Sequence, residues 1–350
     1  MKKADIHAHI LPAKIPDFKA QFGYGGFITL QPEADGSARM VRDDGKFFRH
    51  VQRNCFETDA RIVDLDSKGV DVQVVSTVPV MFNYWAKDED CLKVSQFLND
   101  DIAAVVSSQK KRLIGLGTVP MQNAKLAVQE LERCVKELGL AGIQVGSHVN
   151  QMNLNEADLY PVFEAAEALG ACVFVHPWDM MAQERMQKYW MPWLVGMPAE
   201  TALAICSMIF GGVLERLPNL RVAFAHGGGS FPGTFARIEH GFNVRPDLCA
   251  VDNKKSPREY LGKFWVDSLV HDEEALAFVV KLFGEDKVAL GTDFPFPLGE
   301  DEPGKMIQAS DLLSNACKER LLYKNAIDWL GAEACSHCVL CDTETTRVSG

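Results

Sequence analysis

Most of the chain alternates between short, continuous apolar stretches and longer stretches in which apolar residues recur every three or four positions. A continuous apolar stretch rich in valine is typical of a strand buried on both faces, whereas the second pattern is typical of a helix packed on a core. Several of the longer stretches end at a glycine, a common helix stop. The expected strands span residues 4–10, 70–78, 113–119, 142–146, 172–176, 220–226, 264–268 and 288–292. The expected helices span residues 58–68, 88–108, 124–138, 155–169, 198–217, 231–242 and 273–283, with a last pair within 305–330.

This alternation predicts an α/β fold. Buried strands separated by helices form parallel sheets, and eight repeats of strand and helix are typical of a (β/α)8 TIM barrel. We expect the barrel to occupy residues 1–330. Residues 24–53 break the rhythm, because two Asp-Gly turn pairs separate short apolar runs there. We therefore expect a small antiparallel β insertion at about residues 15–55.

The first expected strand carries a His-x-His motif. Its apolar residues alternate with Asp5, His7 and His9, so the three polar side chains share one face of the strand. Two imidazoles on one face, two residues apart, can bind a single metal ion. A His-x-His pair alone is more often a surface feature, so its meaning depends on the rest of the chain.

Three later strands also end in a histidine or an aspartate. The fifth ends in His176, the sixth in His226, and the eighth runs into Asp293. In a (β/α)8 barrel the carboxyl ends of the strands meet at one face, where active sites form. A buried imidazole or carboxylate costs free energy unless it is paired or bound to a metal. The pattern therefore predicts a metal site at this face.

Three imidazoles and one carboxylate suit Zn²⁺ with one position left for water, whose pKa the ion would lower to about 7. We assign His7, His9, His176 and Asp293 as the ligands. His226 remains beside the metal, where it can act as general base and acid near neutral pH. The fourth strand ends in Gln-Val-Gly, without a lysine or glutamate to bridge a second ion. We therefore expect one Zn²⁺ per subunit.

The charge of the chain limits its partners. The net charge is −11 and the pI is about 5.3, and no basic run exceeds three residues. Nucleic acid and membranes are therefore not expected as partners. We find no signal peptide before the first strand and no uninterrupted apolar run of about 18 residues. The ten cysteines are scattered without a secretory framework, so we expect a cytosolic protein with reduced thiols.

The other histidines and the C-terminal cysteines carry weaker signals. His271 follows the seventh strand and His148 follows the fourth, so both could lie near the mouth of the barrel, whereas His50 and His240 are expected to be structural or exposed. A Cys-x-x-Cys-x-x-Cys run begins at Cys335, but it lacks the second pair of a zinc knuckle. We interpret residues 331–350 as a polar, flexible tail.

The His-x-His start, the two later histidine strand ends and the final Gly-Thr-Asp resemble the amidohydrolase superfamily, whose decarboxylase branch uses one metal ion in this arrangement. Longer stretches narrow the resemblance to the decarboxylases of that superfamily that act on 2-amino-3-carboxymuconate 6-semialdehyde. They are Gly-Tyr-Gly-Gly from residue 23, Ser-Thr-Val-Pro-Val from 76, Phe-Val-His-Pro-Trp-Asp from 174, the segment 189–200, Phe-Ala-His-Gly-Gly-Gly from 224 and Gly-Thr-Asp-Phe-Pro-Phe-Pro from 291. The resemblance runs from residue 1 to about 330.

The resemblance implies further site residues. It implies that Arg49 and Arg237 grip substrate carboxylates, with Arg237 donated by the partner subunit of a homodimer, and that Trp190, Trp193 and Phe296 line or gate the pocket. A planar guanidinium is a natural partner for a carboxylate, and a dicarboxylate would otherwise be repelled by an acidic chain. The residues alone favour plainer alternatives, namely a solvated hairpin arginine at position 49 and a surface or dimer-rim arginine at position 237.

The activity that the resemblance implies is zinc-dependent, non-oxidative decarboxylation of 2-amino-3-carboxymuconate 6-semialdehyde to 2-aminomuconate 6-semialdehyde and CO2. This step of the kynurenine pathway of tryptophan catabolism limits quinolinate formation. His226 would deprotonate the zinc-bound water, and the hydroxide would add beside the departing carboxylate. One alternative is another mononuclear-metal decarboxylase or hydrolase of the superfamily; the carboxylate-binding arginines argue against hydrolysis. The other is an inactive zinc protein that serves as a binding partner, against which the intact His226 argues.

Overall fold

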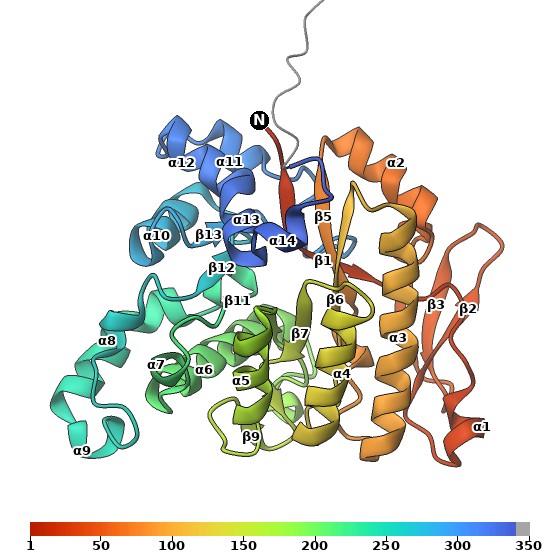
Figure 1. Cartoon of the computed structure of the whole chain (residues 1–350), viewed down its shortest axis with the longest axis horizontal. Coiled ribbons are helices and arrows are strands. Elements are labelled where there is room, and N and C mark those ends of the chain that lie inside the picture. Colours follow the sequence, from red (N-terminus) through yellow and green to blue (C-terminus); the bar gives the residue numbers. More distant parts are fainter. Residues whose placement is uncertain (341–350) are drawn as a thin grey trace, which may run out of the picture.

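The computed structural model describes residues 1–340 and shows one sheet of eight parallel strands curled into a barrel, with helices around it (Figure 1). The strands pair in the order of their labels, so each neighbours the next barrel strand along the chain. They are β1 (Ala4–Ile10), β5 (Val72–Thr77), β6 (Leu113–Gly117), β7 (Gly142–Gly146), β10 (Cys172–His176), β11 (Val222–Phe224), β12 (Trp265–Asp267) and β13 (Val288–Ala289). The predicted α/β barrel is confirmed.

The barrel closes between its first and last strands, where the regular ladder is short. β13 holds only two residues, and the chain beyond it meets β1 through single contacts, such as the His9 amide donating to the Phe294 carbonyl at 2.7 Å. The Asp5 carboxylate accepts from the Thr292 amide at 3.1 Å and from its hydroxyl at 2.7 Å. Isolated backbone hydrogen bonds and these side-chain contacts therefore join the seam in place of a regular ladder, and the strand is shorter than the predicted 288–292.

The helices cover the outside of the barrel, and most begin and end where the pattern predicted. The main ones are α2 (Thr58–Lys68), α3 (Asp88–Ser108), α4 (Ala124–Lys136), α5 (Tyr160–Leu169), α6 (Met197–Phe210), α8 (Phe231–Val244), α10 (Glu273–Phe283) and α13 (Asn325–Leu330). The predicted helix 155–169 starts later, because Pro161 fits only the first turn of a helix. The predicted helix 198–217 is divided into α6 and α7 (Val213–Arg216), because Gly212 has a left-handed φ of 70°.

The early insertion forms a separate small sheet beside α3 (Figure 1). After α1 (Phe18–Phe22), three strands pair antiparallel: β2 (Ile28–Pro32), β3 (Ala38–Arg42) and β4 (Phe47–Val51). The inner faces of these strands share one apolar cluster with the loop after β5 and with α3. This packing fixes the insertion against the barrel and directs β4 toward the carboxyl ends of the strands. The predicted antiparallel insertion is confirmed.

One helical stretch of the described chain, Pro192–Phe210, is long and apolar enough to cross a bilayer by length and composition, with a mean hydropathy of 1.5. Half of it is buried inside the protein, where α6 packs against β10 and α8. An apolar helix between a barrel strand and a neighbouring helix is typical of a core element. We therefore describe it as part of the barrel wall.

The expectation of a loose tail is wrong for residues 331–340. A short helix, α14 (Ala332–Cys335), follows α13 directly. The segment packs against the amino-terminal ends of the strands through buried side chains, namely Cys335, Cys338 and Leu340. Apolar burial of these few side chains holds the segment in place, which the polar composition of the whole tail concealed. Residues 341–350, including the third cysteine of the C-terminal run, lie outside the described residues.

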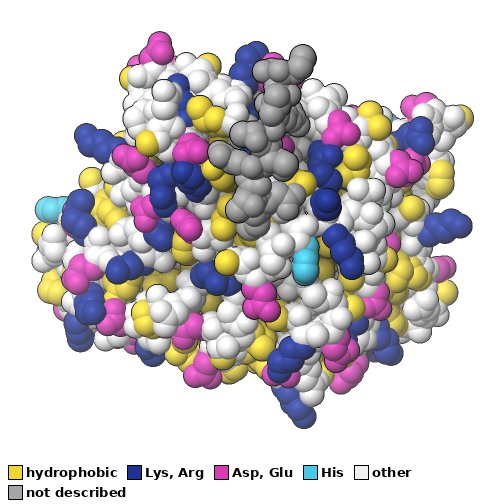
Figure 2. All heavy atoms as spheres, turned by 45° about the horizontal axis from the view of Figure 1, so that its top comes forward, with side chains coloured by type: hydrophobic (Ala, Val, Ile, Leu, Met, Phe, Trp, Pro, Cys, Tyr) yellow, Lys and Arg dark blue, Asp and Glu magenta, His cyan; other side chains and the backbone are white. Residues whose placement is uncertain are grey.

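Figure 2 turns the top of Figure 1 toward the reader and shows how charge is distributed there. Lysine and arginine side chains alternate with aspartate and glutamate side chains over this face, and neither sign gathers into a large block. This mixed face therefore carries no extended positive field.

Candidate metal centre

The first strand carries two histidines into the middle of the barrel. His7 and His9 lie two residues apart on β1, so their side chains leave the strand on the same face. Both are buried, and their Nε2 atoms lie 3.3 Å apart. The structure thus places the predicted pair where a single ion could contact both rings.

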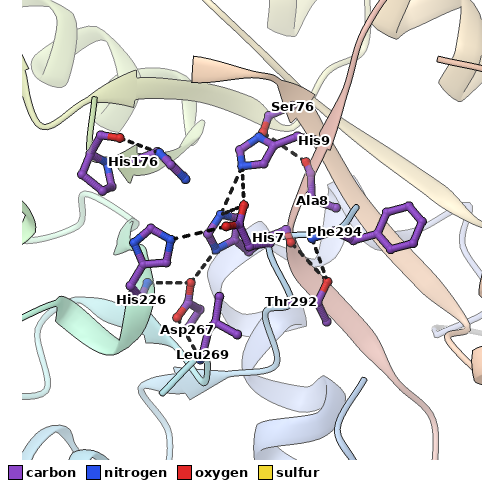
Figure 3. A network of polar contacts seen from close by, with 12 residues as sticks. His7, Ala8, His9, Ser76, His176, His226, Asp267, Leu269, Thr292 and Phe294 are labelled. Atoms are coloured by element: carbon purple, nitrogen blue, oxygen red, sulfur yellow. Dashed lines mark hydrogen bonds and ion pairs between the residues drawn. The ribbon is translucent and has the colours of Figure 1, made fainter. Parts of the chain in front are cut away.

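Two further strand ends bring side chains to the same point, and Figure 3 shows one of them, His176, near His7 and His9. His176 is the last residue of β10, and Asp293 follows β13. The Oδ1 atom of Asp293 lies 3.0 Å from Nε2 of His9 and 3.4 Å from Nε2 of His7. One donor atom from each of the four predicted ligands lies within 4.8 Å of the others. Within residues 1–340, this is the only such group of three or more histidine, cysteine or carboxylate side chains.

The outer nitrogen of each ligand ring has its own acceptor. Nδ1 of His7 lies 2.7 Å from the Asp267 carboxylate. Nδ1 of His9 and Nδ1 of His176 lie 3.1 and 2.9 Å from backbone carbonyl oxygens. A neutral imidazole that donates through Nδ1 keeps a lone pair on Nε2. In that neutral form, the one that binds a metal ion, the three rings present three lone pairs beside a carboxylate.

This arrangement is unfavourable unless a cation lies between the donors. Nε2 of His176 is buried and has no hydrogen-bond partner among the described residues, which is costly in a protein interior. Imidazole nitrogen and carboxylate oxygen are donors that zinc and related divalent ions accept. The residues present therefore fit one divalent metal ion.

The pKa values of Asp293 and His7 also indicate that this cluster stabilises a positive charge. Burial would raise the pKa of Asp293, but hydrogen bonds with the surrounding histidines, the largest effect coming from His226, hold it well below its ordinary value. Burial would lower the pKa of His7, yet the Asp267 and Asp293 carboxylates together raise it to about 10. The two carboxylates thus draw a positive charge to this point, and a divalent ion would supply it.

His226 lies beside the four ligands. It follows β11 with a left-handed φ of 59°, and its ring centroid is 5.1 Å from that of His176 and 5.2 Å from that of His7. Its Nε2 lies 3.8 Å from Oδ2 of Asp293, the oxygen turned away from the His-x-His pair. The His226 side chain is 15% exposed, whereas that of His7 is fully buried. This position at the rim suits a group that exchanges protons with a substrate.

The turn after His226 requires glycine. Gly227 has a φ of 60°, and a Cβ at this position would collide with the side chain of Val270. The first glycine of the Gly-Gly-Gly run is therefore needed to bend the chain sharply after the strand. This bend turns the His226 ring toward the ligand cluster.

Asp267 organises the site and was not among the residues predicted from sequence. It ends β12 and is fully buried. Its Oδ2 accepts from Nδ1 of His7 at 2.7 Å and from the amide of His226 at 2.9 Å, while Oδ1 accepts from the amide of Gly227 at 2.8 Å. One carboxylate thus orients a ligand and the neighbouring turn. The sequence carried a signal for it, since an aspartate ends the seventh strand as histidines end the fifth and sixth, but only His271 was considered there.

A cavity opens directly above the ligands, and three of them line it, namely His9, His176 and Asp293. It is also lined by all the predicted substrate-binding residues except Arg237, namely Arg49, Trp190, Trp193 and Phe296. Arg49 extends from β4 of the insertion and lies over the Phe296 ring at 4.3 Å. Burial lowers the pKa of Arg49 and the nearby Asp293 opposes this shift, so the guanidinium stays charged. The insertion thus delivers one cation to the pocket.

The rest of the pocket wall is largely aromatic. The rings of Trp190 and Trp193 lie 5.9 Å apart, with Trp190 just before and Trp193 within a π-helical turn at Pro192–Gly196. Phe48 and Trp178 also line the cavity, with 5.9 Å between their rings, and neither was predicted from sequence. Aromatic walls exclude water from the space above the ligands, which strengthens electrostatic interactions there.

The other candidates lie outside this cavity. Arg237 is exposed on α8, as expected for a residue that does not serve its own pocket. His271 lines an adjoining apolar cavity together with His226. His50 contacts Glu33 at 2.8 Å within the insertion. Because Arg237 does not line the cavity of its own chain, its predicted role in the pocket of a partner subunit stays a prediction.

Comparisons with known proteins agree with this site. The family model described as amidohydrolase matches residues 4–332. The 2-amino-3-carboxymuconate-6-semialdehyde decarboxylase of Dictyostelium discoideum is 60% identical over 95% of this chain and 92% of its own length. The enzyme of the same name from Caenorhabditis elegans is 43% identical over 94% of each chain.

Solved structures show the same fold at lower identity. The apo form of Metarhizium anisopliae IDCase superposes with a TM-score of 0.79 at 20% identity, covering 94% of this chain and 97% of that one. A dihydroxybenzoic acid decarboxylase from Polaromonas, solved with bound manganese, superposes with a TM-score of 0.74 at 20% identity and covers 94% and 96%. The family match over nearly the whole barrel and the two close relatives show that this chain belongs to the amidohydrolase family, as one of its decarboxylases.

Proposed function

We propose that this decarboxylase converts 2-amino-3-carboxymuconate 6-semialdehyde to 2-aminomuconate 6-semialdehyde and CO2 without an oxidant. The observation that carries the proposal is Arg49, a half-buried cation that shares one aromatic-walled pocket with the ligand cluster. Such a pocket suits a planar, conjugated acid with more than one carboxylate. The names of the two close relatives support the same substrate. The reaction would belong to the kynurenine pathway and limit quinolinate formation, and we propose the cytosol as its location.

We propose Zn²⁺ as the metal, one per subunit. His7, His9, His176 and Asp293 would hold it, because three imidazoles and a carboxylate form a common zinc donor set. When bound, such an ion supplies a Lewis acid and makes water a nucleophile near neutral pH. The manganese in the Polaromonas structure makes Mn²⁺ the alternative that elemental analysis must distinguish.

In the proposed reaction His226 carries the proton. It accepts a proton from water as the water oxygen adds to the conjugated system of the substrate, and it gives that proton to the carbon that bears the carboxylate. The bond to the carboxylate carbon then breaks, and its electron pair restores the double bond as CO2 leaves. The added oxygen departs as hydroxide and takes up a proton from solvent. Hydrogen thus replaces the carboxylate, and one proton is consumed.

Arg49 would bind and orient the carboxylate. A guanidinium can hold a carboxylate through two parallel hydrogen bonds, and the stacking of Arg49 on Phe296 restricts its side chain. A carboxylate turned out of the plane of the conjugated system breaks away more readily, because the breaking bond then overlaps with that system. Orientation of this kind supplies part of the rate.

We further propose a homodimer in which Arg237 enters the pocket of the partner. Arg237 is exposed on α8, which lies at the edge of the molecule in Figure 1, and exposed apolar side chains accompany it at Val244 and Leu248. Within the described residues, Arg49 is the only arginine or lysine that lines the pocket. A second cation from the partner would match a second carboxylate on the substrate.

The alternative is another metal-dependent decarboxylase or hydrolase of the same family. The γ-resorcylate decarboxylase of Polaromonas is 26% identical over 68% of this chain, which favours an aromatic acid as the second candidate substrate.

One experiment tests the substrate and the metal together. Protein loaded with Zn²⁺ or Mn²⁺ is mixed with freshly prepared aminocarboxymuconate semialdehyde, and loss of its near-ultraviolet chromophore is followed together with CO2 release. γ-Resorcylate is the comparison substrate. We expect turnover of the semialdehyde, without added oxidant, at least tenfold more efficient than turnover of γ-resorcylate. Efficient turnover of γ-resorcylate alone would assign the second function instead.

A further inference from the structure

The loop that follows His176 forms one wall of the pocket. Its Trp178 lines the cavity above the ligands and contacts Phe48 of the insertion. Trp178 also lines a second, more polar cavity together with His148 and Asp179. The indole therefore stands between the two cavities, and its position sets the shape of the substrate pocket.

This loop has a strained backbone that other contacts must hold. Asp179 and Ala182 have φ values of 55° and 54°, in the left-handed region that L-residues rarely adopt. Such conformations persist where surrounding contacts determine them. One contact lies within the loop: the side-chain amide of Gln183 donates to the Asp179 carboxylate at 2.9 Å. The stronger ones come from two groups outside it.

Glu200 provides the first of these contacts. It lies on α6, is only 3% exposed, and its Oε1 accepts from the amide of Met181 at 2.7 Å. A hydrogen bond to a buried carboxylate is stronger than one between neutral groups. The neighbouring Met180 packs on Gly196 of the π-helical turn, which leaves no room for a Cβ there.

His148 provides the second contact. Its Nε2 lies 3.1 Å from the carbonyl oxygen of Asp179, and its Nδ1 lies 2.8 Å from the carbonyl oxygen of Asn150. A neutral imidazole donates through one nitrogen only, so both contacts are hydrogen bonds when the ring is an imidazolium. Oε2 of Glu200 lies 3.9 Å from Nε2 of His148, so the two side chains also adjoin each other.

We propose that Glu200 and His148 form a clasp that positions residues 178–183, and through them Trp178, in the wall of the substrate pocket. Neither residue lines that pocket or belongs to the ligand cluster, so both act as positioning residues. The inference rests on the proposed function and deepens it, because it names residues that determine how tightly the substrate fits.

The test compares Glu200→Ala with Glu200→Gln, which keeps an oxygen for the Met181 amide. In Glu200→Ala we expect hydrogen–deuterium exchange of residues 178–183 to be about 10- to 100-fold faster, as loss of a hydrogen bond to a charged group predicts. KM should rise about 3- to 10-fold, because substrate binding loses only part of the free energy of the lost hydrogen bond. The values of kcat and metal content should stay within about twofold. Glu200→Gln should restore most of both. His148→Gln should shift exchange and KM in the same direction, and it serves if Glu200→Ala does not fold.

Glu167→Ala is the matched control. Glu167 accepts from the amide of Asn219 at 2.7 Å, the same kind of contact, but at the amino-terminal end of the strands. Its loss should leave KM unchanged. An equal rise of KM in Glu167→Ala and Glu200→Ala, or faster exchange without a change of KM, would overturn the proposal. If the wild-type protein does not turn over the semialdehyde, the proposed function is refuted instead. Hydrogen–deuterium exchange in the Glu200 and His148 variants would then still decide whether the clasp holds the loop.

Discussion

At the scale of single residues, the site depends on the hydrogen bond that each histidine makes through Nδ1, the nitrogen facing away from the cluster. His7, His9 and His176 each face the cluster with Nε2 because Nδ1 already has an acceptor. The acceptor is a carboxylate for His7 and a backbone carbonyl for the other two. The same Asp267 that orients His7 also holds the turn of His226. Ligands and proposed base are therefore set in position together.

We expect His176→Ala and Asp293→Ala each to lose metal and activity together, because each removes one of four converging donors. Changes around a ligand typically cost about 10- to 100-fold in metal affinity, and loss of a ligand should cost at least as much. Metal per chain is measured by elemental analysis after dialysis. His271→Ala, which changes a histidine outside the cluster, should keep its metal. A ligand variant with about one ion per chain and near-normal turnover would contradict the assignment.

His226→Ala should keep its metal and lose most of its turnover. The ring lies beside the ligands, and general acid–base catalysis contributes about 10²- to 10⁴-fold. The measurements are kcat and metal content on the same sample. Loss of the metal would make His226 a ligand, and normal turnover would exclude it from the reaction.

Asp267→Asn should weaken metal binding about 10- to 100-fold without unfolding the protein. An amide has one accepting oxygen, so it cannot accept from both His7 and the Gly227 amide, which use different oxygens of the carboxylate. Competition with a chelator of known affinity gives the dissociation constant. The control is Asp286→Asn, the same change at an exposed position. Equal affinities in the two variants would show that Asp267 does not support the ligand.

At the scale of elements, the barrel strands position the candidate ligands, and the loops that follow the strands orient the side chains around them. Seven of the eight junctions between neighbouring strands are regular ladders, whereas the junction of β13 and β1 relies on single backbone hydrogen bonds and on the contacts between Asp5 and Thr292. His7 and Asp293 flank this junction, so the weakest part of the ladder carries two ligands. The β insertion adds Arg49, and the loop after β10 adds Trp178.

Thr292→Val should therefore destabilise the protein by about 1–3 kcal/mol, because it removes the hydroxyl that donates to the buried Asp5 carboxylate. Denaturant unfolding measures the change. Thr118→Val is a matched control, since the Thr118 hydroxyl is buried and has no hydrogen-bond partner among the described residues. It should change stability little or raise it. The same loss in both variants would mean that the Asp5 contact does not secure the seam.

At the scale of the whole molecule, the barrel joins residues that lie far apart in the chain. Asp5 and Thr292 are 287 positions apart and hydrogen-bonded. Closure of the sheet turns strand ends into one site, while the exposed α8 carries Arg237 away from it. In the proposed dimer, completion of the pocket depends on a second chain.

The dimer proposal predicts complementation. Arg237→Ala and His226→Ala homodimers should both be nearly inactive. After co-refolding with random mixing, about half the dimers are mixed and each has one complete site, so activity should recover to roughly a quarter of wild type. Differently tagged chains show that mixing has occurred. Mixed dimers without activity would exclude an action of Arg237 across the interface.

The alternation of strands and helices, the barrel, the insertion and the convergence of four candidate ligands could all be predicted from the sequence. These features follow from local periodicity and from one topological rule, that parallel strands end at the same face. The rule is enough to bring His7, His176 and Asp293 together without knowledge of any distance. The bounds of α2, α3 and α10 match the pattern, and both α2 and α10 end at a glycine, which is a local signal.

The buried groups that support those candidate ligands became evident from the folded structure alone. Asp267, Asp5 and the Glu200–His148 clasp act through contacts between segments remote in the chain, and their residue types do not reveal which partner they meet. The burial of residues 331–340 likewise depends on an apolar surface at the amino-terminal ends of the strands, which exists only after the barrel has closed. Local periodicity reports how a segment folds, whereas hydrogen bonds and burial depend on what the closed fold places beside it.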